Sequence, residues 1–217
     1  MARLAQEGRE LHIAIIGEGI TSRHPQRDKV DATEISSLHQ NARAAAKKLG
    51  SSSDVVFFSF PDNRLDTVPL LEIVKVVEDL VQKVKPGIIY THHPGDLNLD
   101  HVVVHRAVLT ATRPISDHVV KEILAFEVPS STEWSFQRFE PTFRANVFED
   151  VSQTLETKIS ALSCYETETR RFPHPRSPEA LRAIAARWGT VAGIEAAEAF
   201  ELIRSIRLPR RQQSNRA

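Results

Sequence analysis

Apolar runs and helical stripes alternate along the first half of the chain, and this alternation restricts the fold more than any other feature. Runs typical of strands buried on both faces occur at 11–17, 54–60 and 88–90. Apolar residues with helical spacing occur at 1–7, 33–49 and 68–85. Strands that alternate with helices pair in parallel through helical crossovers. The order predicts an α/β fold with a mostly parallel sheet.

The second half has a less regular pattern. It predicts strands at 120–128 and 145–148 and helices at 151–165 and 178–187. Residues 196–206 fit a helix or a strand equally well. We expect a single domain over 1–207, followed at 208–217 by a disordered basic tail with almost nothing to bury.

Charge and cysteine content exclude several classes of protein. Lys and Arg number 28 and so do Asp and Glu, so no net charge attracts nucleic acid or anionic lipid. The apolar runs are far shorter than the roughly 18 residues of a membrane span. A single cysteine excludes an internal disulfide and fits a reducing compartment. We therefore expect a cytoplasmic protein with no nucleic-acid partner and no membrane span.

Polar and charged residues follow each strand of the first half. The segments are 17–28, 60–66 and 91–101. Parallel sheets bind ligands beyond the carboxyl ends of their strands, so these segments are the predicted walls of a site. Gly17-Glu18-Gly19 resembles a fragment of a nucleotide-binding loop, but the third glycine and the following helix start are lacking.

Histidine and aspartate gather after the third strand. Four of the nine histidines and two aspartates fall between 92 and 105. Imidazole and carboxylate are the usual ligands of a hydrolytic zinc. On a helix starting near Asp100, His101 and His105 lie on one face, as two ligands of one ion would. The alternative is structural, with Asp100 as a helix N-cap and His105 packed beneath the sheet.

The segment 90–105 also resembles the PIG-L/LmbE-like family of metal-dependent de-N-acetylases, which remove acetyl from N-acetylglucosaminyl groups. Asn-x-Asp-His at 98–101 is similar to the family's second motif. Further similar segments follow the family's order at 17–23, 60–65, 126–134 and 172–177. The resemblance covers about residues 1–207 and implies a Rossmann-like three-layer sandwich.

The resemblance assigns roles to several residues of this segment. It implies that His101 is a zinc ligand and that Asp100 belongs to the acid–base network. Many relatives carry histidine where this chain has Asn98, and an amide cannot shuttle a proton. The acid role therefore passes to another group, for which His92 and His93 are the candidates.

The other segments supply the expected substrate contacts. By resemblance, Arg23, Asp62, Arg64 and Asp96 lie on loops that face the substrate. Ordinary loop polarity and turn formation are the alternative for each of them.

The family's first motif, His-Pro-Asp-Asp-Glu, does not occur in the sequence. By resemblance this motif supplies two of three zinc ligands and the general base, and it follows the first, central strand of the sheet. We therefore expect that the first central strand is missing and that this form is inactive. The expected cause is a start codon assigned downstream of the true one, or a truncated gene. His93, Asp96 and His105 are conceivable replacement ligands, but the base would still be absent.

The leading hypothesis is a zinc-dependent hydrolase that removes acetyl from an N-acetylated amino sugar, such as an N-acetylglucosaminyl conjugate. Its partner is that small-molecule or glycoconjugate substrate, and a homo-oligomer is compatible with the resemblance. The alternative is a catalytically dead sugar-binding or scaffold protein of the same fold.

Overall fold

The computed structural model describes residues 1–24, 26–115 and 120–207, and the predicted alternation is present. The tail expected at 208–217 lies outside the described residues. The first half comprises α1 (Ala2–Gln6), β1 (Ile13–Gly17), α2 (Ala32–Lys48), β2 (Val55–Phe60), α3 (Leu70–Val84), β3 (Ile88–His92) and α4 (Leu99–Ala111). The second half comprises β4 (Glu122–Phe126), β5 (Val147–Asp150), α5 (Leu155–Leu162), α6 (Pro178–Ala192) and β6 (Ala197–Ser205).

Side-chain caps define the starts of three helices. The side chains of Asp31, Asn98 and Ser177 accept hydrogen bonds from backbone amides two or three residues later, at the starts of α2, α4 and α6. Helix α6 also has Pro178 in its first turn and ends at Gly193, whose φ of 74° is left-handed. The ambiguous segment 196–206 is the strand β6, because it pairs with β4 and β5.

The strands form two separate sheets in the described part of the chain. Strands β1 and β2 pair in parallel, with Ile13 opposite Val55. The second sheet has the order β3-β4-β6-β5, and its β3–β4 pair is parallel. The predicted parallel pairing is present in β1–β2 and in β3–β4, while β6 runs antiparallel to both of its neighbours.

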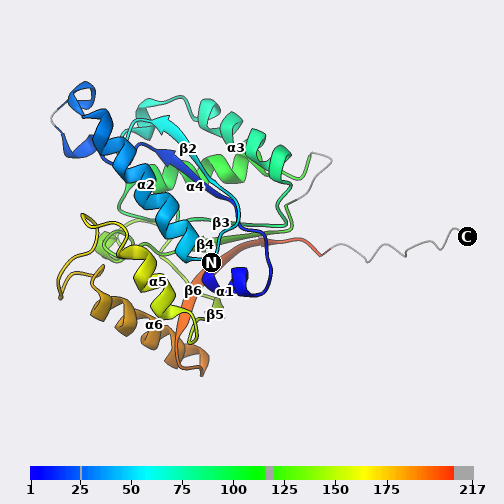
Figure 1. The fold of residues 1–217 in the computed structure, drawn as a ribbon. Coiled ribbons are helices and arrows are strands. Elements are labelled where there is room, and N and C mark those ends of the chain that lie inside the picture. Colours follow the sequence, from blue (N-terminus) through cyan, green and yellow to red (C-terminus); the bar gives the residue numbers. More distant parts are fainter. Residues whose placement is uncertain (25, 116–119, 208–217) are drawn as a thin grey trace, which may run out of the picture.

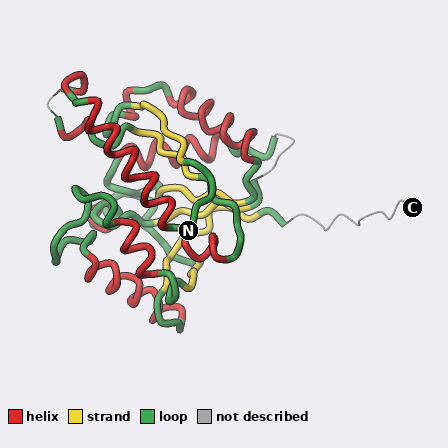
Figure 2. The backbone as a smooth tube through the Cα atoms, in the orientation of Figure 1, coloured by secondary structure: helices red, strands yellow, loops and turns green. Residues whose placement is uncertain are grey.

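Helices cover the strands in two groups, which gives the expected α/β layers. Helices α3 and α4 pack against each other, while α2 contacts α5 and α5 contacts α6. Figure 1 places β1 and β2 between α2 and α3, and Figure 2 shows the same layering by element type. The main core cluster joins α3 and α4 to strands of both sheets through Ile16, Ile89 and Ile123.

Strands β1 and β3 each pair with a single neighbour among the described strands. Some apolar strand residues are more open than strand interiors normally are, with Val56 of β2 at 41% and Ile88 of β3 at 45% exposed. No strand of the described residues joins the two sheets.

No helix of the described segments is both long and apolar enough to cross a membrane.

Candidate active site

The segments that follow β1, β2 and β3 meet at one edge of the fold, as predicted. The backbone amide of Ser22 donates to Asp62 Oδ2 at 3.2 Å, and Asn63 Nδ2 donates to Ser22 Oγ at 3.1 Å. The backbone amide of Asn63 then donates to Asp100 Oδ2 at 2.6 Å. The three predicted walls are therefore joined by direct hydrogen bonds.

The centre of this site is a pair formed by Asp96 and His101. His101 Nδ1 lies 3.1 Å from Asp96 Oδ1, and the Asp96 side chain is fully enclosed. The same carboxylate accepts hydrogen bonds from the Asn98 amide at 2.8 Å, from Thr132 Oγ1 at 2.6 Å and from Ser131 Oγ. A carboxylate on one ring nitrogen orients the ring and leaves the other nitrogen for a metal or a substrate.

The charge state of Asp96 follows from these contacts. Burial alone would raise the pKa of Asp96, but the contacts with His101, Ser131, Thr132 and Asn98 outweigh it and lower the pKa to about 2. Asp96 is therefore a fixed anion that accepts hydrogen bonds. The substrate contact predicted for Asp96 stays a prediction, and in the structure its enclosed carboxylate lies against His101 Nδ1.

His92 stacks on His101, with ring centroids 4.1 Å apart and planes 12° from parallel. Burial of the His92 ring, with a smaller contribution from nearby His101, lowers the pKa of His92 to about 3. His92 is therefore neutral near pH 7 and supports the orientation of His101 by packing. This charge state argues against His92 as the general acid.

His93, the other candidate acid, is completely buried. Its Nε2 lies 2.8 Å from the carbonyl oxygen of Pro141, and its Nδ1 lies 3.3 Å from Glu201 Oε2. Nε2 is therefore engaged by a backbone carbonyl, whereas Nδ1 lies near Glu201 without hydrogen-bond geometry. The sequence did not identify Glu201, because it comes from β6, more than a hundred residues away.

Asp100 and Asn98 have structural roles at the start of α4. Asn98 is the N-cap, which corrects the alternative that gave this role to Asp100. Both oxygens of Asp100 accept backbone amides, from Asn63 and from Leu65 at 2.9 Å. Burial raises the pKa of Asp100, and these two amides oppose that increase.

His105 is packed, as the structural alternative expected. It is 4% exposed, and its Nδ1 lies 2.8 Å from the carbonyl oxygen of His92. Burial lowers the pKa of His105, although the hydrogen bond to His92 opposes the change.

The other expected substrate-binding residues lie in the loops after β1 and β2. Arg23 forms an ion pair with Glu168, which also pairs with Arg176. Asp62 accepts hydrogen bonds from Ser22, while Arg64 lines an open cavity beside this loop.

Besides Glu201, four contributors to this region had no role in the sequence predictions. Ser131 and Thr132 lie in the segment 126–134, and Arg176 lies in 172–177. Both segments were part of the family resemblance, so their place in it was the available signal. Glu168 lies just before the second segment, and nothing in the sequence marked it.

The described residues do not fit a complete catalytic zinc centre. Such a centre takes three protein ligands and keeps one position open. No group of three or more His, Cys, Asp or Glu side chains in the described ranges is arranged to hold a metal ion. His101, the predicted ligand, is therefore not part of such a group in the described residues.

Known proteins resemble this chain in sequence and in fold. It is 27% identical over 173 residues to the uncharacterized deacetylase YaiS of Escherichia coli (strain K12). The aligned region covers 77% of this chain and 80% of YaiS. Its fold matches N,N'-diacetylchitobiose deacetylase from Pyrococcus horikoshii with a TM-score of 0.70 and 15% identity, covering 94% of this chain and 76% of the other. It also matches GalB, the 4-carboxy-2-hydroxymuconate hydratase of Pseudomonas putida KT2440, with a TM-score of 0.72 and 19% identity, covering 96% and 90%.

Two of these three relatives are named deacetylases and one is a hydratase, so the fold alone does not decide the reaction. The family match is more specific. Residues 1–112, just over half of the 217, match the family described as PIG-L: GlcNAc-PI de-N-acetylase. This match includes Asp96, in the loop after β3, and His101, in the first turn of α4, and the chain belongs to the PIG-L de-N-acetylase family.

Proposed function

We propose that this protein is a hydrolase of the de-N-acetylase type whose substrate is an N-acetylated amino sugar, such as an N-acetylglucosaminyl conjugate. The observation that carries the proposal is the buried Asp96–His101 pair within the segment that matches the family. The diacetylchitobiose deacetylase with this fold acts, by its name, on an acetylated amino sugar, which supports the substrate class.

In this proposal each residue has a role that its contacts support. Asp96 holds His101 through Nδ1, so that Nε2 is presented to the site. Asn98, at the start of α4, offers an amide that can donate a hydrogen bond to the substrate but cannot transfer a proton. Arg23, Asp62 and Arg64 form the outer wall that the sugar contacts.

We further propose that the family's zinc dependence extends to this protein and that the 217-residue form does not turn over. The reason is the ligand count, because one oriented imidazole does not hold zinc with useful affinity. By the resemblance, the other ligands belong to the His-Pro-Asp-Asp-Glu motif, which this sequence does not contain.

The test compares the 217-residue protein with a form extended by the in-frame codons that precede Met1 in the gene. We expect the extended form to release acetate from N-acetylglucosamine conjugates and to hold zinc. In that form His101→Ala should lower the zinc content sharply, whereas His12→Ala, a change at an exposed histidine, should not. The absence of acetate release from the extended form would refute the deacetylase proposal, and unchanged zinc in His101→Ala would refute the ligand assignment.

A catalytically inactive sugar-binding protein is the second candidate. It is favoured by the same ligand count, since the outer wall is present while a complete metal-ligand set is not found in the described residues. Elemental analysis of the 217-residue form separates the two candidates. Stoichiometric zinc would count against an inactive module, whereas sugar binding without zinc in both forms would favour it.

A further inference from the structure

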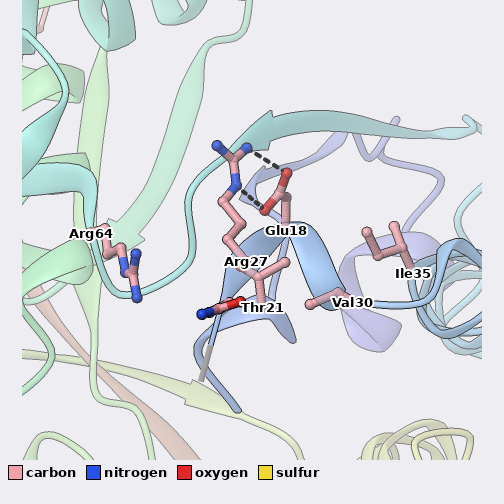
Figure 3. Close-up of a pocket in the computed structure, with 7 residues that line it drawn as sticks. Glu18, Thr21, Arg27, Val30, Ile35 and Arg64 are labelled. Atoms are coloured by element: carbon pink, nitrogen blue, oxygen red, sulfur yellow. Dashed lines mark hydrogen bonds and ion pairs between the residues drawn. The ribbon is translucent and has the colours of Figure 1, made fainter. Parts of the chain in front are cut away.

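An open cavity of about 510 Å³ is lined by residues of the loops after β1 and β2, and the deacetylase proposal leaves its ligand unassigned. Its polar lining consists of Glu18, Thr21, Gln26, Arg27 and Arg64, and Val30 is one of two aliphatic residues beside them (Figure 3).

The lining contains two guanidinium groups and one carboxylate. Arg27 takes up that carboxylate, with Nε 2.9 Å from Glu18 Oε2 and Nη2 2.6 Å from Oε1. This pairing lowers the pKa of Glu18 and keeps it ionised. Among the described residues of this lining, Arg64 therefore carries the only positive charge that no carboxylate of the lining neutralises.

Within the described segments, the Arg64 guanidinium has no hydrogen-bond or ion-pair partner. Figure 3 shows it at one end of the cavity, apart from the Glu18–Arg27 pair. A guanidinium presents its donors in a planar fork that matches carboxylate and phosphate oxygens. An unpaired Arg64 at a cavity wall is thus a donor set for an oxyanion.

The backbone of Arg64 is held firmly although its side chain is free. The amides on either side of it, at Asn63 and Leu65, donate to the two oxygens of Asp100. Thr67 Oγ1 donates to the Arg64 carbonyl oxygen at 2.7 Å. Since Asp100 directly precedes His101, one carboxylate links the loop of Arg64 to the helix that carries His101.

We propose that this cavity binds an oxyanion, either phosphate or carboxylate, through the guanidinium of Arg64. The substrate carries this oxyanion at a position away from its acetamide. The identity of the rest of the ligand, an N-acetylated amino sugar, depends on the proposed function. The substrate class is therefore an acidic amino-sugar conjugate. The aliphatic residues of the lining, such as Val30, contact the atoms that connect the sugar to its charged group.

Calorimetric binding to the 217-residue protein tests this proposal, with neutral N-acetylglucosamine, N-acetylglucosamine 1-phosphate and N-acetylmuramic acid as probes. We expect at least one acidic sugar to bind roughly tenfold more tightly than the neutral sugar. The two acidic sugars distinguish phosphate from carboxylate as the preferred group. Arg64→Met should remove the advantage, and Arg64→Lys should restore part of it because a point charge remains.

Arg9→Met is the matched control, since Arg9 is exposed and lies after α1, outside the cavity lining. Equal affinity for neutral and acidic sugars would overturn the anion site and leave the deacetylase proposal standing. Retention of the advantage in Arg64→Met, or its loss in Arg9→Met, would also overturn it. If none of the sugars binds, the same measurement with methyl phosphate decides. Binding of methyl phosphate that depends on Arg64 supports the anion site while the amino-sugar proposal fails. No binding of methyl phosphate refutes the site.

Discussion

The segments after β3 and after β1 occupy equivalent places in the fold, but they are held by different interactions. The β3 wall, residues 91–101, contains the enclosed side chains of Asp96 and His93 and is fixed by hydrogen bonds. The β1 wall, residues 17–28, depends on ion pairs of Arg23 and Arg27, whose side chains are 41% and 45% exposed. The difference separates a preorganised centre, which suits chemistry, from a charged surface that suits recognition.

The comparison predicts that the β3 wall tolerates almost no change of backbone position. A Cβ at Gly95 would lie 2.0 Å from the carbonyl oxygen of Pro141 and 2.9 Å from His93 Nε2. Gly95→Ala therefore forces the loop to move, and we expect a loss of about 3 kcal/mol in the free energy of unfolding. Urea denaturation measures this loss.

Gly87→Ala is the control, because a Cβ at Gly87 would meet nothing within 4 Å. We expect that change to have little effect on stability. Equal stability of the two variants would mean that the loops carrying Gly95 and Pro141 are not tightly packed, and the contrast between the walls would then be lost.

The anion inside the β3 wall should make stability depend on pH. The pKa of Asp96 falls from an ordinary 3.8 to about 2, so its contribution is complete above 3.8 and disappears as the pH decreases towards 2. Asp96→Asn should remove about 2 kcal/mol of unfolding free energy at neutral pH and almost none near pH 2. Chemical denaturation across this pH range measures the difference.

Asp66→Asn serves as the reference for this experiment, since Asp66 is exposed. A pH profile for Asp96→Asn parallel to that of the original protein would contradict the assignment of Asp96 as the buried anion.

The β1 wall should show a smaller effect that depends on salt. Burial opposes ionisation of Glu168, but Arg23 and Arg176 outweigh it and lower the pKa of Glu168. A double-mutant cycle of Arg23→Ala and Glu168→Ala should give a coupling of roughly 0.5 to 1 kcal/mol at low salt, because Arg23 is partly solvated. At about 0.5 M NaCl the coupling should decrease by roughly half.

The pair Arg43–Asp54 offers a comparison, since its side chains are 49% and 77% exposed and its distance is 3.3 Å. We expect a coupling near zero there. A coupling between Arg23 and Glu168 that does not respond to salt would place this pair in a dry environment like that of Asp96.

Local patterns in the sequence predicted most elements of the fold. The alternation of apolar runs located β1, β2 and β3, and the helical stripe at 68–85 located α3. Strand β6 stayed ambiguous because its assignment depends on pairing with β4 and β5, which are distant in the chain. The antiparallel direction of this pairing was for the same reason not predictable from local periodicity.

The candidate site was predictable in composition but less so in its roles. The histidine and aspartate cluster after β3 pointed to His101 and Asp96. The position of Asp96 behind His101 depends on Ser131 and Thr132, which approach only in the folded chain. Likewise, the burial of His93 follows from contacts with Pro141 and Glu201, which no spacing rule predicts.

The central claim is that Asp96 fixes His101 through Nδ1 and leaves Nε2 free to act. Nitrogen-15 NMR of the imidazole rings tests it at about pH 9, above the ordinary range for imidazole protonation, with His101→Gln to assign the signals. The claim predicts that His101 carries its proton on Nδ1, with an unprotonated Nε2, and that Asp96→Asn disturbs this preference. A His101 ring with its proton on Nε2 in the original protein would contradict it.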